Sequence, residues 1–137
     1  AILRVKLKYL DRFNAQRNLI AQQYINNLDS QAFTHQKIAK NTFSNFHVFQ
    51  SKYHGPRDSL VEFLAKNNIQ TNIYYLFPHH LQKSLAFLNY SIGDLPNAEK
   101  LSNKVIALPI YPELESNKID DIVSAINNYS RSALSND

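Results

Sequence analysis

The apolar positions in the first part of the chain recur at the spacing of one helix face, and no proline or glycine interrupts them. Such a stripe predicts one long amphipathic helix over residues 1–28. At 1.5 Å per residue this helix would be about 40 Å long, longer than a small domain needs, so we expect it to link this domain to another. The stripe consists of Leu3, Leu7, Leu10, Ile20, Tyr24 and Leu28.

Three later segments have the patterns of β-strands. Residues 43–49 alternate between two faces, residues 69–75 are rich in β-branched and aromatic side chains, and residues 105–108 form a short apolar run that ends at Pro109. The polar stretch 29–41 has weak periodicity, and we expect it to be a loop.

Helices are expected between and after these strands. Gly55-Pro56 opens the first, because proline suits the first helical position, and Asn67-Asn68 ends it in the role that glycine usually takes. The polar tail over 132–137 is expected to be frayed. Further helices are predicted over 81–88, 97–104 and 116–130.

The resulting order, α-β-α-β-α-α-β-α, predicts an α/β fold of the two-layer α+β kind, in which a small sheet lies against helices. We expect one domain with one hydrophobic core over residues 1–137. A composition of 44% hydrophobic and 19% charged residues is too apolar for disorder, and the apolar runs are too short for a membrane span.

Several chemistries are excluded by composition. The chain has no cysteine, which rules out disulfides, zinc ribbons and a thiol nucleophile, and its 2 glycines cannot build a glycine-rich phosphate loop. It contains no methionine and begins inside a predicted helix, so we expect it to be a piece of a larger protein. The sequence shows no leader segment, and a cytoplasmic location is therefore expected.

The net charge of +4 raises the question of nucleic acid. Arg4, Lys8 and Arg12 are spaced four apart, so a helix would place them on one face. Such a face can grip phosphates, but it is more often the solvated side of an amphipathic helix. Both interpretations stay open at this point.

The segment 73–82 (IYYLFPHHLQ) carries the most unusual chemistry. Its tyrosines, histidines and glutamine can hydrogen-bond a polyhydroxylated ligand without a net charge, or they belong to an aromatic strand that leads into a surface loop. Adjacent histidines of an extended loop point in opposite directions, so no metal site is expected at His79-His80. His47 is either a core histidine or a ligand contact.

Seven motifs follow one another along the chain. They are LRVKLKYLD (3–11), FHVF (46–49), RDSL (57–60), IQTNIYY (69–75), PHHLQ (78–82), LPNAEKL (95–101) and LPIYPEL (108–114). In this order they resemble the DegT/StrS-type sugar aminotransferases. The first motif is similar to the helix that links the two domains of these enzymes, and the fourth and fifth together resemble the substrate-side loop of the family. Tyr74 stands where the family often has histidine, which suggests a particular subset of keto-sugars.

The resemblance implies the small C-terminal domain of a fold type I aminotransferase. The parent enzyme would be a homodimer that uses pyridoxal phosphate to transfer an amino group, usually from glutamate, to a nucleotide-linked keto-deoxysugar. Such reactions belong to deoxysugar and lipopolysaccharide or polysaccharide biosynthesis. The Schiff-base lysine would lie in the large domain, so this chain alone is expected to be inactive, with neither nucleic acid nor membrane as a partner.

The resemblance also implies substrate-side residues, with no catalytic residue and no metal ligand in this chain. A non-catalytic, regulatory relative of the same fold remains the alternative, and a basic nucleic-acid-binding module is a further one. The implied substrate contacts are Tyr74, Tyr75, His47, His80 and Gln82.

Overall fold

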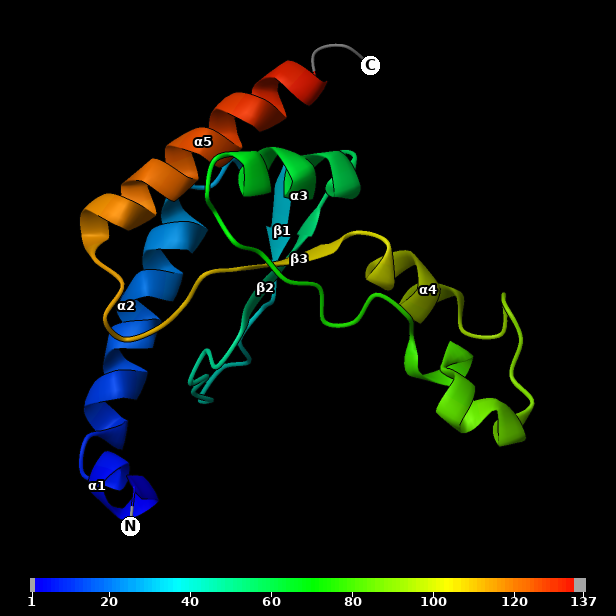
Figure 1. Ribbon diagram of the computed structural model, residues 1–137, viewed down its shortest axis with the longest axis horizontal. Helices are drawn as coiled ribbons and strands as arrows, with labels where there is room; N and C mark the ends of the chain where they lie inside the picture. Colours follow the sequence, from blue (N-terminus) through cyan, green and yellow to red (C-terminus); the bar gives the residue numbers. More distant parts are fainter. Residues whose placement is uncertain (1, 135–137) are drawn as a thin grey trace.

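A three-stranded antiparallel sheet lies at the centre of the computed structural model, which describes residues 2–134 (Figure 1). The strands are β1 (Phe33–His35), β2 (Phe49–Tyr53) and β3 (Val105–Leu108), in the order β1-β2-β3. The register places Phe33 opposite Tyr53 and Phe49 opposite Leu108. The predicted α/β two-layer architecture is therefore confirmed.

Three helices pack against this sheet: α2 (Leu10–Asn27), α3 (Arg57–Lys66) and α5 (Ser116–Leu134). Helix α5 lies along both α2 and α3 (Figure 1). Tyr24 of α2 packs its ring 5.0 Å from that of Phe49 and donates its hydroxyl proton to the Pro109 carbonyl at 3.0 Å. The largest fully buried apolar and aromatic side chains among the described residues are Tyr24, Tyr53, Leu60, Leu64, Ile106, Ile119 and Ile126.

A lobe of short helices projects from the body (Figure 1). It contains η1 (His79–Leu81), η2 (Lys83–Leu88) and α4 (Pro96–Ser102), where η denotes a 3₁₀-helix. At the base of the lobe, the buried Arg57 guanidinium donates to the Ser102 carbonyl at 2.9 Å and the Val105 carbonyl at 3.4 Å. These bonds tie the end of α4 and the start of β3 to the first turn of α3.

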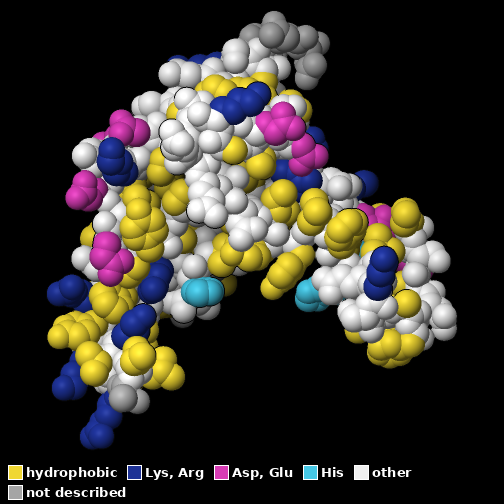
Figure 2. Space-filling model, viewed as in Figure 1, with side chains coloured by type: hydrophobic (Ala, Val, Ile, Leu, Met, Phe, Trp, Pro, Cys, Tyr) yellow, Lys and Arg dark blue, Asp and Glu magenta, His cyan; other side chains and the backbone are white. Residues whose placement is uncertain are grey.

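The predicted unbroken first helix is wrong. Helix α1 (Ile2–Leu7) stops, and the amide groups of Lys8 and Tyr9 donate to carbonyls three residues back, in a tight turn before α2. Leu3 is 82% exposed, so no packing surface holds this end of the stripe in one straight helix. Figure 2 shows hydrophobic and basic side chains together on the surface around α1, and hydrophobic side chains on the lobe.

Two strand predictions need correction. Residues 43–48 form a loop, and Phe49 is the only residue of the predicted strand 43–49 that lies in β2. Phe46 adopts a left-handed conformation (φ 44°), which interrupts an extended strand. The side chains of Ser44 and Asn45 also accept hydrogen bonds from the amides two residues further on, in place of strand pairing. The predicted strand over 69–75 shrinks to one bridge between Asn72 and Ala107.

The remaining elements follow the sequence more closely. Helix α3 ends before Asn68, whose φ of 58° confirms its role as a left-handed terminator. The predicted loop over 29–41 contains β1, and the predicted helix over 81–88 is η1 followed by η2. Of the tail predicted to be frayed, residues 132–134 belong to α5, whereas 135–137 lie outside the described residues.

No helix among residues 2–134 is both long and apolar enough to cross a membrane.

Gly55 occupies a position where the buried Tyr53 ring leaves no room for a side chain. A Cβ atom added there would lie 2.6 Å from the Tyr53 hydroxyl oxygen and 2.7 Å from Cζ. Since Tyr53 is fully buried and cannot swing away, we predict that Gly55→Ala lowers the free energy of unfolding by about 1–3 kcal/mol. Urea denaturation measures this change.

The matched control is Lys66→Ala, at an exposed position on the last turn of α3. It should change stability by less than about 0.5 kcal/mol. Equal stability of Gly55→Ala and the wild type would contradict the predicted clash.

Candidate functional site

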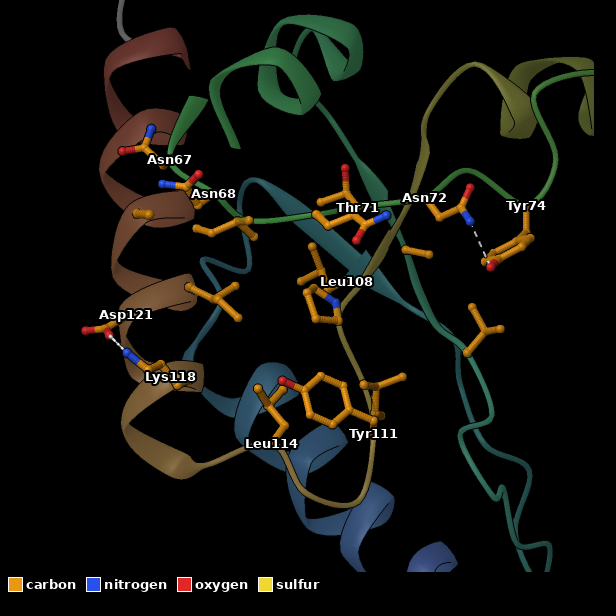
Figure 3. A pocket seen from close by; sticks show the side chains of 18 of the residues that line it. Asn67, Asn68, Thr71, Asn72, Tyr74, Leu108, Tyr111, Leu114, Lys118 and Asp121 are labelled. Atoms are coloured by element: carbon orange, nitrogen blue, oxygen red, sulfur yellow. Dashed lines mark hydrogen bonds and ion pairs between the residues drawn. The ribbon is translucent and has the colours of Figure 1, made fainter. Parts of the chain in front are cut away.

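Two clefts meet at Tyr74. The larger, about 870 Å³, lies between the loop that follows α3, the segment that leaves β3 and the first turns of α5 (Figure 3). The smaller, about 300 Å³, lies between that loop and the lobe. Tyr74 lines both clefts and is 38% exposed.

The backbone of Tyr74 is held by a side chain of the central strand. Gln50 of β2 donates from Nε2 to the Tyr74 carbonyl at 2.7 Å and accepts the Tyr74 amide proton on Oε1 at 3.1 Å. The Tyr74 hydroxyl oxygen accepts a hydrogen bond from Asn72 Nδ2 at 2.9 Å (Figure 3). Tyr74 is therefore fixed at both its backbone and its hydroxyl while its ring stays accessible.

Tyr75 is more open than its neighbour. It is 57% exposed, and its ring meets that of Tyr74 edge-on at 5.8 Å and that of His79 at 5.4 Å. It lines only the smaller of the two clefts. The two tyrosines thus present adjacent aromatic and hydroxyl surfaces at the junction.

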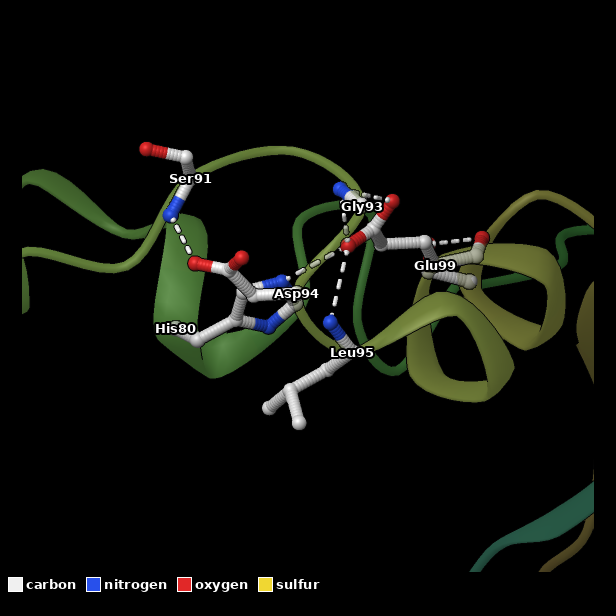
Figure 4. Close-up of polar contacts among 7 residues, drawn as sticks. His80, Ser91, Gly93, Asp94, Leu95 and Glu99 are labelled. Carbon is white, nitrogen blue, oxygen red and sulfur yellow. Dashed lines mark hydrogen bonds and ion pairs between the residues drawn. The ribbon is translucent and has the colours of Figure 1, made fainter.

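His80 is buried in the wall of the smaller cleft, where it connects η1 to α4. Its Nε2 lies 3.0 Å from Glu99 Oε1 (Figure 4). The ring of Tyr90 meets the His80 ring edge-on, with 6.0 Å between the ring centroids. The same carboxylate accepts the Gly93 amide proton at 2.9 Å on Oε1 and the Leu95 amide proton at 3.3 Å. Glu99 of α4 therefore links His80 of η1 to the turn at residues 93–95.

The other two expected substrate contacts lie apart from Tyr75. His47 is exposed on the loop before β2 and lines the larger cleft, so it is not a core histidine. Gln82 lines neither cleft; it precedes η2, and its Nε2 donates to the Phe77 carbonyl at 3.5 Å. The structure thus gathers Tyr74 with His47 on one side and with Tyr75 and His80 on the other.

Three residues that hold the candidate site in place are not singled out by the sequence pattern: Gln50, Asn72 and Glu99. Each acts through a partner on another element or through a turn that only the fold creates. A weak signal exists at Gln50, a polar residue between the buried Phe49 and Ser51 of a strand, which predicts that it faces away from the core.

The polar lining of the larger cleft is mostly neutral, with amide and hydroxyl groups. Its lysine is Lys118, which is 63% exposed and lies 3.9 Å from Asp121 at the mouth (Figure 3). Lys104 lies elsewhere and donates to the His54 and Gly55 carbonyls. Among the described residues, the larger cleft therefore offers mostly neutral groups suited to a polar ligand, and its lysine stands exposed at the mouth. Within 2–134 no cluster of three or more His, Asp or Glu side chains could hold a metal ion.

Hydrogen bonds to Glu99 predict a pH dependence of the lobe. The Gly93 amide, followed by His80 and the Leu95 amide, lowers the pKa of the Glu99 carboxyl below its ordinary 4.5. The unfolded chain then binds more protons, so this stabilisation is present above about pH 4.5 and is lost as the pH falls through the folded value. We predict that the protection of the Gly93 and Leu95 amides, which is the intrinsic exchange rate at each pH divided by the observed rate, falls as the pH drops below about 4.5.

The control variants separate this effect from general acid unfolding. Glu99→Gln should lower the protection of the Gly93 amide already at neutral pH and remove its further loss in acid, whereas Glu62→Gln, an exposed change on α3, should leave the wild-type protection profile intact. A protection factor at Gly93 that stays constant from pH 6 to pH 3 in the wild type would refute the prediction.

Known proteins resemble this chain over nearly its whole length. It is 37% identical over 133 residues to the "Pleiotropic regulatory protein" of Geobacillus stearothermophilus, covering 96% of this chain and 36% of that protein. It is 31% identical over 129 residues to the dTDP-3-amino-3,6-dideoxy-α-D-galactopyranose transaminase of Aneurinibacillus thermoaerophilus, covering 94% of this chain and 35% of that protein. The chain thus spans about a third of the length of these relatives.

A solved structure of a sugar aminotransferase relative has a similar fold over this part of its chain. The chain superimposes on Streptomyces venezuelae DesV, determined in complex with a ketimine intermediate, with a TM-score of 0.88 and 29% identity over 94% of this chain and 35% of DesV. Residues 1–127 match the sequence pattern shared by the DegT/DnrJ/EryC1/StrS aminotransferase family. The resemblance seen in the motifs is confirmed: the chain belongs to the DegT/DnrJ/EryC1/StrS aminotransferase family.

Proposed function

We propose that this chain is the C-terminal small domain of a pyridoxal-phosphate-dependent aminotransferase that acts on a nucleotide-linked keto-deoxysugar. The chain contributes the side of the active site that binds the sugar. The observation that carries this proposal is the exposed Tyr74–Tyr75 pair, which Gln50 fixes at the junction of two clefts in a member of a sugar aminotransferase family.

The chemistry of the junction suits a sugar. Phenol and amide groups donate and accept hydrogen bonds without a net charge, and aromatic rings cover the apolar faces of a pyranose. Tyr74 offers its hydroxyl to the ligand, Tyr75 offers its ring, and His47 also lines the larger cleft. His80 positions the lobe through Glu99, and we assign it no direct ligand contact.

The cofactor is assigned to the rest of the parent protein. Pyridoxal phosphate supplies the electron sink for transamination, and the lysine that binds it is expected in the large domain. The amino donor, usually glutamate in this family, the homodimeric assembly, the cytoplasmic location and a role in deoxysugar or lipopolysaccharide biosynthesis are parts of the same proposal. Residues 1–28 then form the connection between the domains.

A regulatory role without catalysis is the second candidate, because the Geobacillus relative carries a regulatory name. We favour transamination because the Aneurinibacillus relative is named as a transaminase and the DesV structure holds a ketimine intermediate. A single assay separates the two roles: the full-length protein is mixed with pyridoxal phosphate, glutamate and a dTDP-linked keto-sugar. Formation of 2-oxoglutarate supports transamination.

In the full-length protein, we predict that Tyr74→Phe slows only the half-reaction with the sugar. A lost hydrogen bond to the sugar costs about 0.5–1.5 kcal/mol, so the sugar half-reaction should slow several-fold while the glutamate half-reaction keeps its rate. Single-turnover kinetics measure each half separately. The sugar half is followed in reverse with dTDP-3-amino-3,6-dideoxy-α-D-galactopyranose, the amino sugar in the name of the Aneurinibacillus relative.

Tyr9→Phe is the matched control, because Tyr9 is 47% exposed and lines neither cleft. It should leave both half-reactions unchanged. Equal slowing of both halves by Tyr74→Phe, or no slowing of either, shows that this loop does not recognise the sugar.

We predict that the 137-residue chain alone does not bind pyridoxal phosphate through a specific lysine. Lys118 is exposed and lies beside Asp121, so neither cleft encloses a lysine among the described residues. The purified chain, mixed with pyridoxal phosphate and then desalted, should retain no lasting visible absorption band. Borohydride treatment before desalting, followed by peptide mapping, should show sparse labelling spread over several lysines. Stoichiometric labelling of one lysine would overturn this expectation.

A further inference from the structure

The side chain of Gln50 imitates a neighbouring strand. Residues alternate along β2, so Phe49 and Ser51 are buried in the core while Gln50 faces the opposite side of the sheet. There its amide donates to the Tyr74 carbonyl and accepts the Tyr74 amide proton, at 2.7 and 3.1 Å. Both ends of one rigid amide are used, which fixes the Tyr74 backbone against β2 in one orientation.

Asn72 fixes the other end of Tyr74. Its Oδ1 accepts the Ile73 amide proton at 2.8 Å, so its Nδ2 must be the atom that faces the Tyr74 hydroxyl at 2.9 Å. The backbone of Asn72 is itself anchored to the edge of the sheet, because it exchanges two hydrogen bonds with Ala107 at 3.1 and 2.8 Å. Asn72 is therefore a rigid donor.

These bonds determine the polarity of the Tyr74 hydroxyl. The oxygen accepts a proton from Asn72, and the hydrogen bonds found among residues 2–134 include no acceptor for the hydroxyl's own proton. With the ring 38% exposed at the junction of the clefts, that proton is free to be donated to a ligand. A ligand oxygen that accepts, such as a sugar hydroxyl or a keto oxygen, is the matching group.

We infer that Gln50 and Asn72 are positioning residues that hold Tyr74 as a hydrogen-bond donor to an oxygen of the sugar. The inference rests on the proposed function and extends it, because it names the two residues that give Tyr74 its place and its polarity. Gln50 sets where the hydroxyl lies, and Asn72 sets which way its proton points.

The first test uses the 137-residue chain itself and needs no ligand. Amide hydrogen exchange, followed by NMR, should show that the Tyr74 amide is protected in the wild type. Gln50→Leu should speed its exchange by on the order of five- to tenfold, because the acceptor is lost. Lys52→Leu is the matched control, since Lys52 is exposed on the same face of the same strand, two residues away. Core amides such as that of Ile106 should exchange equally slowly in all three proteins.

The second test reverses the polarity of the Asn72 contact in the full-length protein. In Asn72→Asp the carboxylate still accepts the Ile73 amide proton, but it cannot donate to Tyr74 and instead accepts the phenol's proton. The sugar half-reaction, measured with dTDP-3-amino-3,6-dideoxy-α-D-galactopyranose, should slow about as much as in Tyr74→Phe, while the glutamate half-reaction keeps its rate. The double variant should be no slower than Tyr74→Phe, since both changes remove one interaction.

Asn117→Asp is the matched control for the added charge. Asn117 makes the same local bond, from the Lys118 amide to its Oδ1 at 2.8 Å, but does not contact Tyr74. Both half-reactions should keep their wild-type rates in this variant.

The outcomes distinguish a failure of the proposed function from a failure of the roles of Gln50 and Asn72 alone. An inactive wild-type protein, or a Tyr74→Phe variant with normal sugar kinetics, removes the proposed role of this loop and the inference with it. A slowed Tyr74→Phe combined with a normal Asn72→Asp, or a Tyr74 amide that stays protected in Gln50→Leu, overturns the inference alone. Slowing of the sugar half by Asn72→Asp, without further loss in the double variant, supports it.

Discussion

The antiparallel pairing of β2 with β3 is the constraint on which both the core and the candidate site depend. Phe49 packs on Tyr24 in the core, and the alternation of a strand then forces Gln50 onto the opposite face, next to Ala107 of β3. Ala107 in turn bonds to the backbone of Asn72. The loop that carries Tyr74 is thus fixed to a sheet that the hydrophobic core has already oriented, and a shift of one residue in the register would bury Gln50 and release the loop.

The lobe is held by a different kind of interaction. Its side chains are mostly exposed, so polar anchors take the place of a second core: Glu99 binds His80 and the amides of the 93–95 turn, and Arg57 binds the end of α4. Such anchors are local and few, and segments with little buried apolar contact open at lower free energy than the core. The smaller cleft therefore has one rigid wall, at Gln50 and Tyr74, and one wall that can move.

The sequence predicted the elements whose side chains repeat over several turns or lie in an uninterrupted apolar run, namely α3, α5 and β3. The strand prediction failed at Ser44 and Asn45, because their side chains bond to nearby amides in place of strand-to-strand pairing. It also failed over 69–75, where a segment with the composition of a strand forms only one β-bridge, at Asn72. For the site, the tyrosine pair stood out by chemistry. The residues that hold it did not, because the pairing of Gln50 with Tyr74 across 24 positions exists only once the sheet has formed.

The tyrosine at position 74 also gives the site a property that histidine lacks. An imidazole has two nitrogens whose donor and acceptor roles depend on tautomer and protonation, whereas a phenol has a single oxygen that both accepts and donates. Because the Tyr74 oxygen already accepts a hydrogen bond from Asn72, its hydroxyl proton is the group left for a ligand. Under the proposed function, position 74 thus carries a donor whose direction is set by its neighbours and which selects among sugar oxygens by geometry. The neutral amides of the larger cleft are consistent with the same principle, because they too recognise oxygen and nitrogen positions without attracting charge.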